Sequence, residues 1–173
     1  YTKENAFEKA EQIDAALVRA YNKFNDMNGY AVSFFGDGTA NFLKGEGADV
    51  LGGARGAADL GGFCNYWALQ STNGSFNGAW TALYQLASYA NLALEGLEII
   101  GDLDPEKAKY LEAQAKFFRG WAYLRLAECF GGVPIVEKFS EELKFDYTRE
   151  TRENTYTFAI EDLKVAAAGL PQY

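Results

Sequence analysis

The chain lacks the side chain on which much hydrolytic and metal chemistry depends. None of its 173 residues is histidine, which excludes Ser-His-Asp and Cys-His catalysis and every histidine-based metal site. Pairs of carboxylates remain as formal candidates for glycoside hydrolysis, namely Glu46 with Asp49 and Asp37 with Asp59. Acidic residues in glycine-rich loops are normally solvated, and no pattern places two of these at a working separation. The sequence therefore predicts a protein that is not an enzyme.

Aromatic and amide side chains between residues 63 and 73 are the better candidates for ligand contact. Tyr66 and Trp67 end an aromatic stretch, and a polar stretch that includes Asn73 follows them. Sugar rings stack their C–H faces on such aromatic rings, and their hydroxyl groups bond to amide side chains. An aromatic cluster in a loop can equally anchor that loop to neighbouring helices. Both interpretations of Tyr66, Trp67 and Asn73 stay open.

Nothing in the sequence indicates a cofactor. Gly36-Asp37-Gly38 is an isolated Gly-x-Gly without the strand and helix pattern of a phosphate-binding loop, so it predicts a turn. No dense acidic loop points to calcium. Cys64 and Cys129 are expected to be two unreactive thiols rather than a disulfide.

Charge and hydropathy bound the class of protein. A net charge of −8 argues against nucleic acid, which is bound through clustered Lys and Arg, and disfavours an anionic membrane surface. No apolar run approaches the roughly 20 residues that span a bilayer, and no signal peptide is expected, because Tyr1 opens directly into a helical pattern. The length, with 49% hydrophobic residues, fits a single helical domain over 1–173.

Helical spacing of apolar residues predicts four helices, at about 2–27, 75–99, 104–130 and 151–168. The third is the most strongly marked, with Asp104 as N-cap and Gly131 and Gly132 as its stop. Its two adjacent apolar rows predict packing on more than one side, and Gly120 predicts a tight helix crossing. Other expectations are Thr2 as the cap of the first helix, core positions for Trp80 and Trp121, and an inner face of the fourth helix made by Tyr156, Ala159 or Ile160, Leu163 and Ala167.

The segment between the first two helices, residues 29–74, differs from the rest. It holds 11 of the 18 glycines. A loop of this length within a compact domain is unusual and tends to be functional. The expected fold class is therefore all-α, with antiparallel helical hairpins and a long glycine-rich loop between the first two helices.

The third helix and the turn after it contain Ala-Lys-Phe-Phe-Arg at 115–119, Ala-Tyr at 122–123, Leu126 and Phe-Gly-Gly-Val-Pro-Ile-Val at 130–136. This stretch resembles the hallmark helix and turn of the SusD/RagB family of nutrient-binding outer-membrane lipoproteins. Gln114, Phe118 and Gly120 depart from the usual residues, which affects packing detail. Further matching positions are Trp80, Leu83, Tyr84, Asn91, Arg149, Thr151, Tyr156, Asp162, Leu163, Leu170 and Pro171.

The resemblance implies that the helices form tetratricopeptide-like pairs and that the chain is the N-terminal part of a longer SusD-like protein. It also implies a lipid-anchored protein on the outer face of the outer membrane. Such a protein binds oligosaccharides and acts as the lid of a TonB-dependent transporter of the SusC type. A RagB-like lid for peptides and a helical interaction scaffold without a small ligand remain alternatives. For Arg119 the preferred interpretation is structural, as an ion pair or a bond to loop carbonyls that fixes the long loop.

Overall fold

The computed structural model describes residues 7, 9–28, 71–72, 74–139 and 146–171. These residues contain four helices and no strand: α2 (Ala10–Asn28), α5 (Gly74–Ile100), α6 (Pro105–Phe130) and α7 (Arg152–Gly169). The chain divides into two compact units. One comprises Tyr1–Lys23 and Leu83–Tyr173, and the other Phe24–Ala82. Everything that follows on packing concerns the first unit, which contains most of α2 and α5 and all of α6 and α7.

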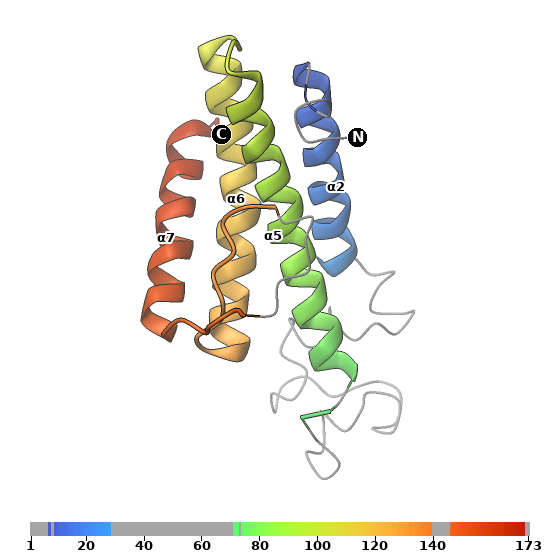
Figure 1. The fold of residues 1–173 in the computed structure, drawn as a ribbon, viewed down its shortest axis with the longest axis vertical. Helices are drawn as coiled ribbons and strands as arrows, with labels where there is room; N and C mark the ends of the chain where they lie inside the picture. Colours follow the sequence, from blue (N-terminus) through green and yellow to red (C-terminus); the bar gives the residue numbers. More distant parts are fainter. Residues whose placement is uncertain (1–6, 8, 29–70, 73, 140–145, 172–173) are drawn as a thin grey trace. The chain divides into compact units, whose positions relative to one another are not determined.

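The helices of this unit form antiparallel pairs, as the sequence predicts. Helices α6 and α7 approach each other closely at two places. A Cβ added to Gly120 of α6 would lie 2.9 Å from the carbonyl oxygen of Ala159 in α7, and a Cβ added to Gly169 of α7 would lie 2.6 Å from the Cβ of Ala113 in α6. Early residues of α6 thus face late residues of α7, which makes the two antiparallel (Figure 1). The first of these contacts is also the tight crossing that Gly120 predicts.

Helix α6 lies at the centre of the unit and contacts the other three helices. Its Phe118 packs edge-on against Tyr21 of α2, with ring centroids 4.6 Å apart, and its Arg119 bonds to Asn91 of α5. The buried positions cover more than one side of the helix and include both predicted apolar rows in part, while the side that carries Tyr110, Trp121 and Glu128 is exposed or half-buried. Packing on more than one side is therefore confirmed, and Ala115, Ala122, Tyr123 and Leu126 form the middle of the core.

The predicted ends of the helices agree with the structure except at the first. Asp104 caps α6 by accepting a bond from Lys107 N, and the helix stops at Gly131, whose φ is +76°. Helix α2 begins at Ala10, whereas Phe7 and Lys9 are not helical, so the predicted start at residue 2 is wrong. Phe7 is buried instead against Gly96 of α5, a tertiary contact that the local pattern does not contain. The predicted cap Thr2 lies outside the described residues.

The predicted inner face of α7 is partly wrong. The buried row consists of Thr155, Ala159, Asp162 and Ala166. Only Ala159 was expected there; Tyr156 and Leu163 are half-buried, while Ile160 and Ala167 are exposed. The prediction chose apolar residues, but α7 faces α6 with small and polar side chains because the close crossing at Gly120 leaves little room and α6 presents a charge there.

Candidate functional site

The residues with the clearest potential for ligand contact, Tyr66, Trp67 and Asn73, lie outside the described residues. The formal carboxylate pairs, Glu46 with Asp49 and Asp37 with Asp59, also lie outside them, as does Cys64. What the structure does describe is a buried polar cluster on α6 and a cavity beside it.

The polar cluster is built around Arg119. Its guanidinium group makes two parallel bonds to the Asp162 carboxylate, from Nε to Oδ2 at 2.5 Å and from Nη2 to Oδ1 at 3.0 Å. Lys116 Nζ, one turn earlier on α6, contacts the same Oδ1 at 2.8 Å. The side chains of Arg119 and Asp162 are only 5% and 4% exposed. Such a fork-to-carboxylate pair links α6 to α7 with fixed geometry.

The third guanidinium nitrogen of Arg119, Nη1, bonds to partners outside α7. Nη1 donates to Asn91 Oδ1 of α5 at 2.9 Å and to the Glu137 carbonyl oxygen at 3.3 Å. The guanidinium carbon also lies 4.9 Å from the centre of the Phe158 ring. The structural interpretation of Arg119 is thus supported, since it makes an ion pair and bonds a carbonyl group. That carbonyl belongs to the segment after α6, whereas nearly all of the long loop that Arg119 was predicted to fix lies outside the described residues.

Tyr123, one turn after Arg119, is completely buried. Its hydroxyl group accepts a bond from Val136 N at 2.7 Å and lies 3.3 Å from Val136 O. Its ring meets those of Tyr84 and Phe158 edge-on. Burial raises the pKa of Tyr123 to about 12, against smaller lowering effects of the Val136 N–H and of Arg119. Burial likewise raises the pKa of Tyr84, and the neighbouring Tyr123 adds to that rise.

The raised pKa values of Tyr123 and Tyr84 predict that the folded chain loses stability at alkaline pH. Below the ordinary tyrosine pKa of 10.0, Tyr123 is neutral in both the folded and the unfolded chain, so its contribution is fully present. As pH rises from about 10 to about 12, the unfolded chain loses this proton while the folded chain keeps it, which favours unfolding. Two pKa units correspond to about 2–3 kcal/mol. Urea denaturation over this pH range measures the decline, and Tyr123→Phe is expected to make it shallower. An equally steep decline in the variant would contradict this assignment.

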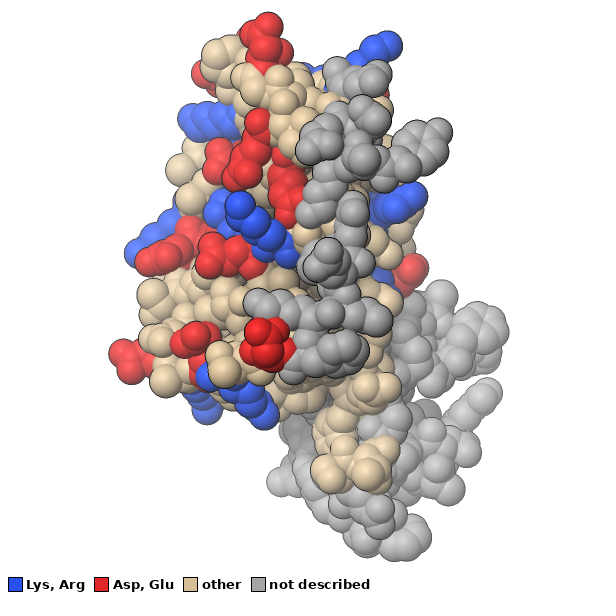
Figure 2. Space-filling model, viewed as in Figure 1, with Lys and Arg blue, Asp and Glu red and all other residues tan. Residues whose placement is uncertain are grey.

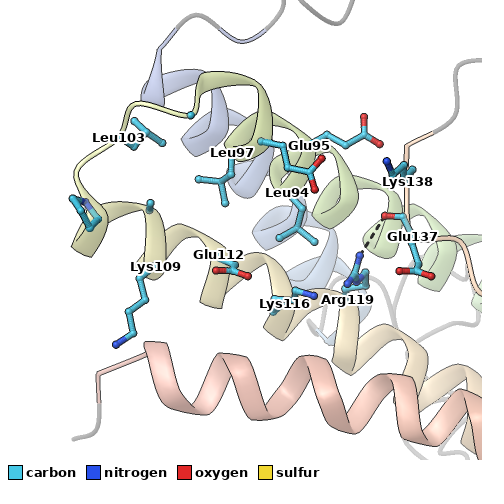
Figure 3. A pocket seen from close by; sticks show the side chains of 14 residues that line it. Leu94, Glu95, Leu97, Leu103, Lys109, Glu112, Lys116, Arg119, Glu137 and Lys138 are labelled. Atoms are coloured by element: carbon cyan, nitrogen blue, oxygen red, sulfur yellow. Dashed lines mark hydrogen bonds between the residues drawn. The ribbon is translucent and has the colours of Figure 1, made fainter.

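A cavity of about 590 Å³ opens beside the cluster (Figure 3). Leu94, Glu95 and Leu97 of α5 form one wall and Glu112, Lys116 and Arg119 of α6 another, while Glu137 and Lys138 close one end. The remaining lining residues are Glu98, Gly101, Leu103, Pro105, Ala108 and Lys109. The described part of the lining thus combines an apolar surface with charges of both signs and contains no aromatic ring.

The part of the chain that the structure describes shows no catalytic arrangement. The buried carboxylate of Asp162 is neutralised by Arg119 and Lys116, and within the described part of the chain no group of three or more potential ligands could hold a metal ion. Acidic and basic side chains are interspersed on the face shown in Figure 2, rather than gathered into a patch of one sign.

Two other predictions receive partial corrections. Trp80 and Trp121 are half-buried rather than core residues. Trp121 lies at the edge of α6 with the guanidinium carbon of Arg125 5.5 Å from its ring centre, a contact typical of a helix surface. Cys129 is a half-buried free thiol whose pKa is raised by burial, which agrees with an unreactive role.

Sequence reasoning did not assign roles to Asp162 and Asn91, although both occur among the motif positions. The only available signal was a polar residue at a helical position that otherwise faces inward: Asp162 follows Ala159 by three residues. A buried carboxylate at such a position requires a cation, and Arg119 on the neighbouring helix is the matching one.

Comparison with known proteins shows the family. Residues 3–173 match the model of a SusD-like family described as starch-binding and associating with the outer membrane. The chain belongs to this SusD-like family. The four helices among the described residues agree with the predicted all-α fold class of the SusD-like chain.

Individual relatives agree. The SusD-like chain is 30% identical over 131 residues to SusD-like protein P2 of Formosa agariphila, a match that covers 75% of this chain and 25% of the relative. A SusD superfamily protein of Bacteroides vulgatus has the same fold with a TM-score of 0.79 at 23% identity, covering 95% of this chain and 36% of that one. A laminarin-binding SusD-like protein matches with a TM-score of 0.77 at 23% identity, covering 95% and 35%. The chain therefore spans only about a quarter to a third of the length of these relatives.

The family description associates these proteins with the outer membrane. Among the residues that the structure describes in the SusD-like chain, no helix is long and apolar enough to cross a membrane.

Proposed function

We propose that this chain is the N-terminal helical part of a non-catalytic, cell-surface protein that binds oligosaccharides. The observation that carries the proposal is the match to the SusD-like family over residues 3–173. It is supported by the likeness in fold to a laminarin-binding SusD-like protein.

The whole protein would be held by an N-terminal lipid at the extracellular face of the outer membrane. There it would act as the lid of a TonB-dependent transporter of the SusC type and deliver captured glycan to it. The family's association with the outer membrane supports this placement. The polar cluster around Arg119 would then serve the lid by holding its helices together, not by touching the ligand, because Arg119 and Asp162 are almost fully buried and paired with each other.

Glycan contact is proposed for Trp67, Tyr66 and Asn73. Neutral sugars are bound by stacking on aromatic rings and by neutral hydrogen-bonding groups. Among the described residues, the lining of the cavity beside α6 has neither an aromatic ring nor an uncharged amide side chain. Its character supports a glycan site elsewhere in the protein, with the aromatic residues of the 29–74 loop as candidates.

The test is a binding screen on the full-length protein with neutral β- and α-linked glucans and with peptides. We expect measurable glucan binding that falls at least tenfold in Trp67→Ala, equivalent to about 1.4 kcal/mol. Tyr110→Ala is the matched control, because Tyr110 is an exposed aromatic residue on α6. Unchanged binding in Trp67→Ala would remove that residue from the site, whereas equal losses in both variants would indicate a general effect on the protein.

A peptide ligand is the second candidate, favoured by one observation. The cavity lining carries both Glu112 and Lys116 beside Leu94 and Leu97. Charges of both signs next to apolar side chains suit a polypeptide better than a neutral sugar. Binding of peptides but of no glycan in the same screen, weakened by Glu112→Gln, would favour the peptide-importing lid. Binding of neither class would favour an interaction scaffold.

A further inference from the structure

The segment that follows α6 is extended but is not part of a sheet among the described residues. Residues 132–139, here called the strap, leave the end of α6 and turn back along the helices (Figure 1). Among the described residues, the strap makes one bond to another backbone segment, from Glu150 N to Val133 O at 3.1 Å. Extended backbone that is not in a sheet must have its buried N–H and C=O groups satisfied in another way.

Side chains from the helices satisfy these groups. Helix α5 provides Tyr84, whose hydroxyl donates to Pro134 O at 2.7 Å, and Asn91, whose Nδ2 donates to Val136 O at 2.7 Å. Glu95 of the same helix accepts a bond from Phe139 N at 2.5 Å. Three side chains on one face of α5, at helical spacing, thus bond the strap along its length.

The other two helices bond the same strap. Tyr123 and Arg119 of α6 contact the backbone of Val136 and Glu137, as described above. Thr155 of α7 accepts a bond from Val133 N at 3.4 Å. Val133 is completely buried. One chain segment is therefore tied to α5, α6 and α7 through its backbone.

Two of the side chains that bond the strap also bond side chains between the helices. Asn91 bonds both the strap and Arg119, and Arg119 bonds both the strap and Asp162 of α7. Asn91 is 1% exposed and Arg119 4%. Because each of these buried polar groups uses several partners at once, moving the strap would leave Asn91 and Arg119 short of bonds, which is costly in a buried site.

We propose that the strap is a lock that joins α5, α6 and α7 into one rigid body and holds the Glu137 and Lys138 end of the cavity in place. The consequence for a lid, which rests on the proposed function, is that these three helices move together when the lid opens. The lock itself is a property of the chain and is independent of any ligand.

Amide hydrogen exchange on the full-length protein tests the lock. In the unaltered protein, the Val136 amide should exchange within about tenfold of the rate of the Ala122 amide in the middle of α6. Tyr123→Phe removes only the hydroxyl group that accepts from Val136 N, so Val136 should exchange about ten times faster while Ala122 is unchanged. Arg125→Ala is the control, because the described contacts of Arg125, with Glu128 and with the Trp121 ring, are both to residues of α6 itself.

Three outcomes would overturn the proposal. They are rapid exchange of Val136 in the unaltered protein, an unchanged rate in Tyr123→Phe, and an equal acceleration of all amides, which would mean that the bond serves global stability only. Glu95→Ala is a second and milder variant at a half-buried site, and it should accelerate Phe139 alone. Since exchange is measured without ligand, these results are separate from a failure to bind glycan.

Discussion

Replacing Arg119 with methionine is expected to lower the free energy of unfolding by about 3 kcal/mol. Methionine keeps much of the apolar stem of the side chain but removes the bonds to Asp162, Asn91 and the Glu137 carbonyl group. Removing one partner of a buried ion pair commonly costs about 3–5 kcal/mol, because the other charge stays buried without its counterion. The lower end applies here, since Lys116 remains within 2.8 Å of Asp162. Urea denaturation followed by circular dichroism measures the change.

A double-mutant cycle separates the buried charge from the lost packing. Asp162→Leu removes the carboxylate that Arg119→Met leaves behind, so the double variant should lose less stability than the two single variants added together. Arg125→Ala is the matched control, because the Arg125 and Glu128 side chains are 36% and 41% exposed. An exposed pair of this kind contributes about 0–1 kcal/mol. If Arg119→Met lowered the free energy of unfolding no more than Arg125→Ala, Arg119 would not be the residue that holds the polar cluster together.

The second large effect is expected at Gly132, where the strap begins. A Cβ at this position would meet three backbone atoms at the start of α7. It would overlap the Glu150 carbonyl oxygen and lie 2.9 Å from Thr151 C and 3.0 Å from Arg152 N. Backbone atoms cannot rotate away as a flexible side chain can. Gly132→Ala should therefore displace the strap from α7 and lower the free energy of unfolding by about 3 kcal/mol.

The matched control for Gly132→Ala is Gly101→Ala in the turn between α5 and α6. Gly101 has a φ of +62° and nothing near its missing Cβ, so alanine there pays only the conformational cost of about 1–2 kcal/mol. Comparing the two variants by urea denaturation isolates the steric term. Equal losses would mean that the strap and the start of α7 adjust freely, and would argue against a locked strap.

How far the sequence predicts the structure depends on whether the cause is local. Helices α5, α6 and α7 are predicted to within two residues because apolar periodicity, the Asp104 and Thr151 caps and the glycine stops act within a few residues along the chain. The predicted start of α2 is wrong because Phe7 is held outside the helix by a contact with Gly96, about ninety residues away in the sequence. Local propensity contains no information on such a contact.

The face that each helix buries was harder to predict where polar residues are involved. For α6 the apolar rows identified most of the core, but Gln114 and Arg119 are also buried. For α7 the apolar choice placed Ile160 inward, whereas it is 46% exposed. A buried polar residue is identified only through its partner, and these partners lie on other helices.

By itself the sequence determined that the chain is all-helical, where three of its helices lie, which family it resembles, and that histidine-dependent chemistry is excluded. Only the tertiary structure decided what Arg119 does. Its partners Asn91 and Asp162 are 28 and 43 residues away in the sequence, and they meet it only because α5 and α7 both pack against α6. The same packing decides the role of the strap. Its sequence predicts only that α6 stops there, whereas the side chains that bond its backbone come from three separate helices.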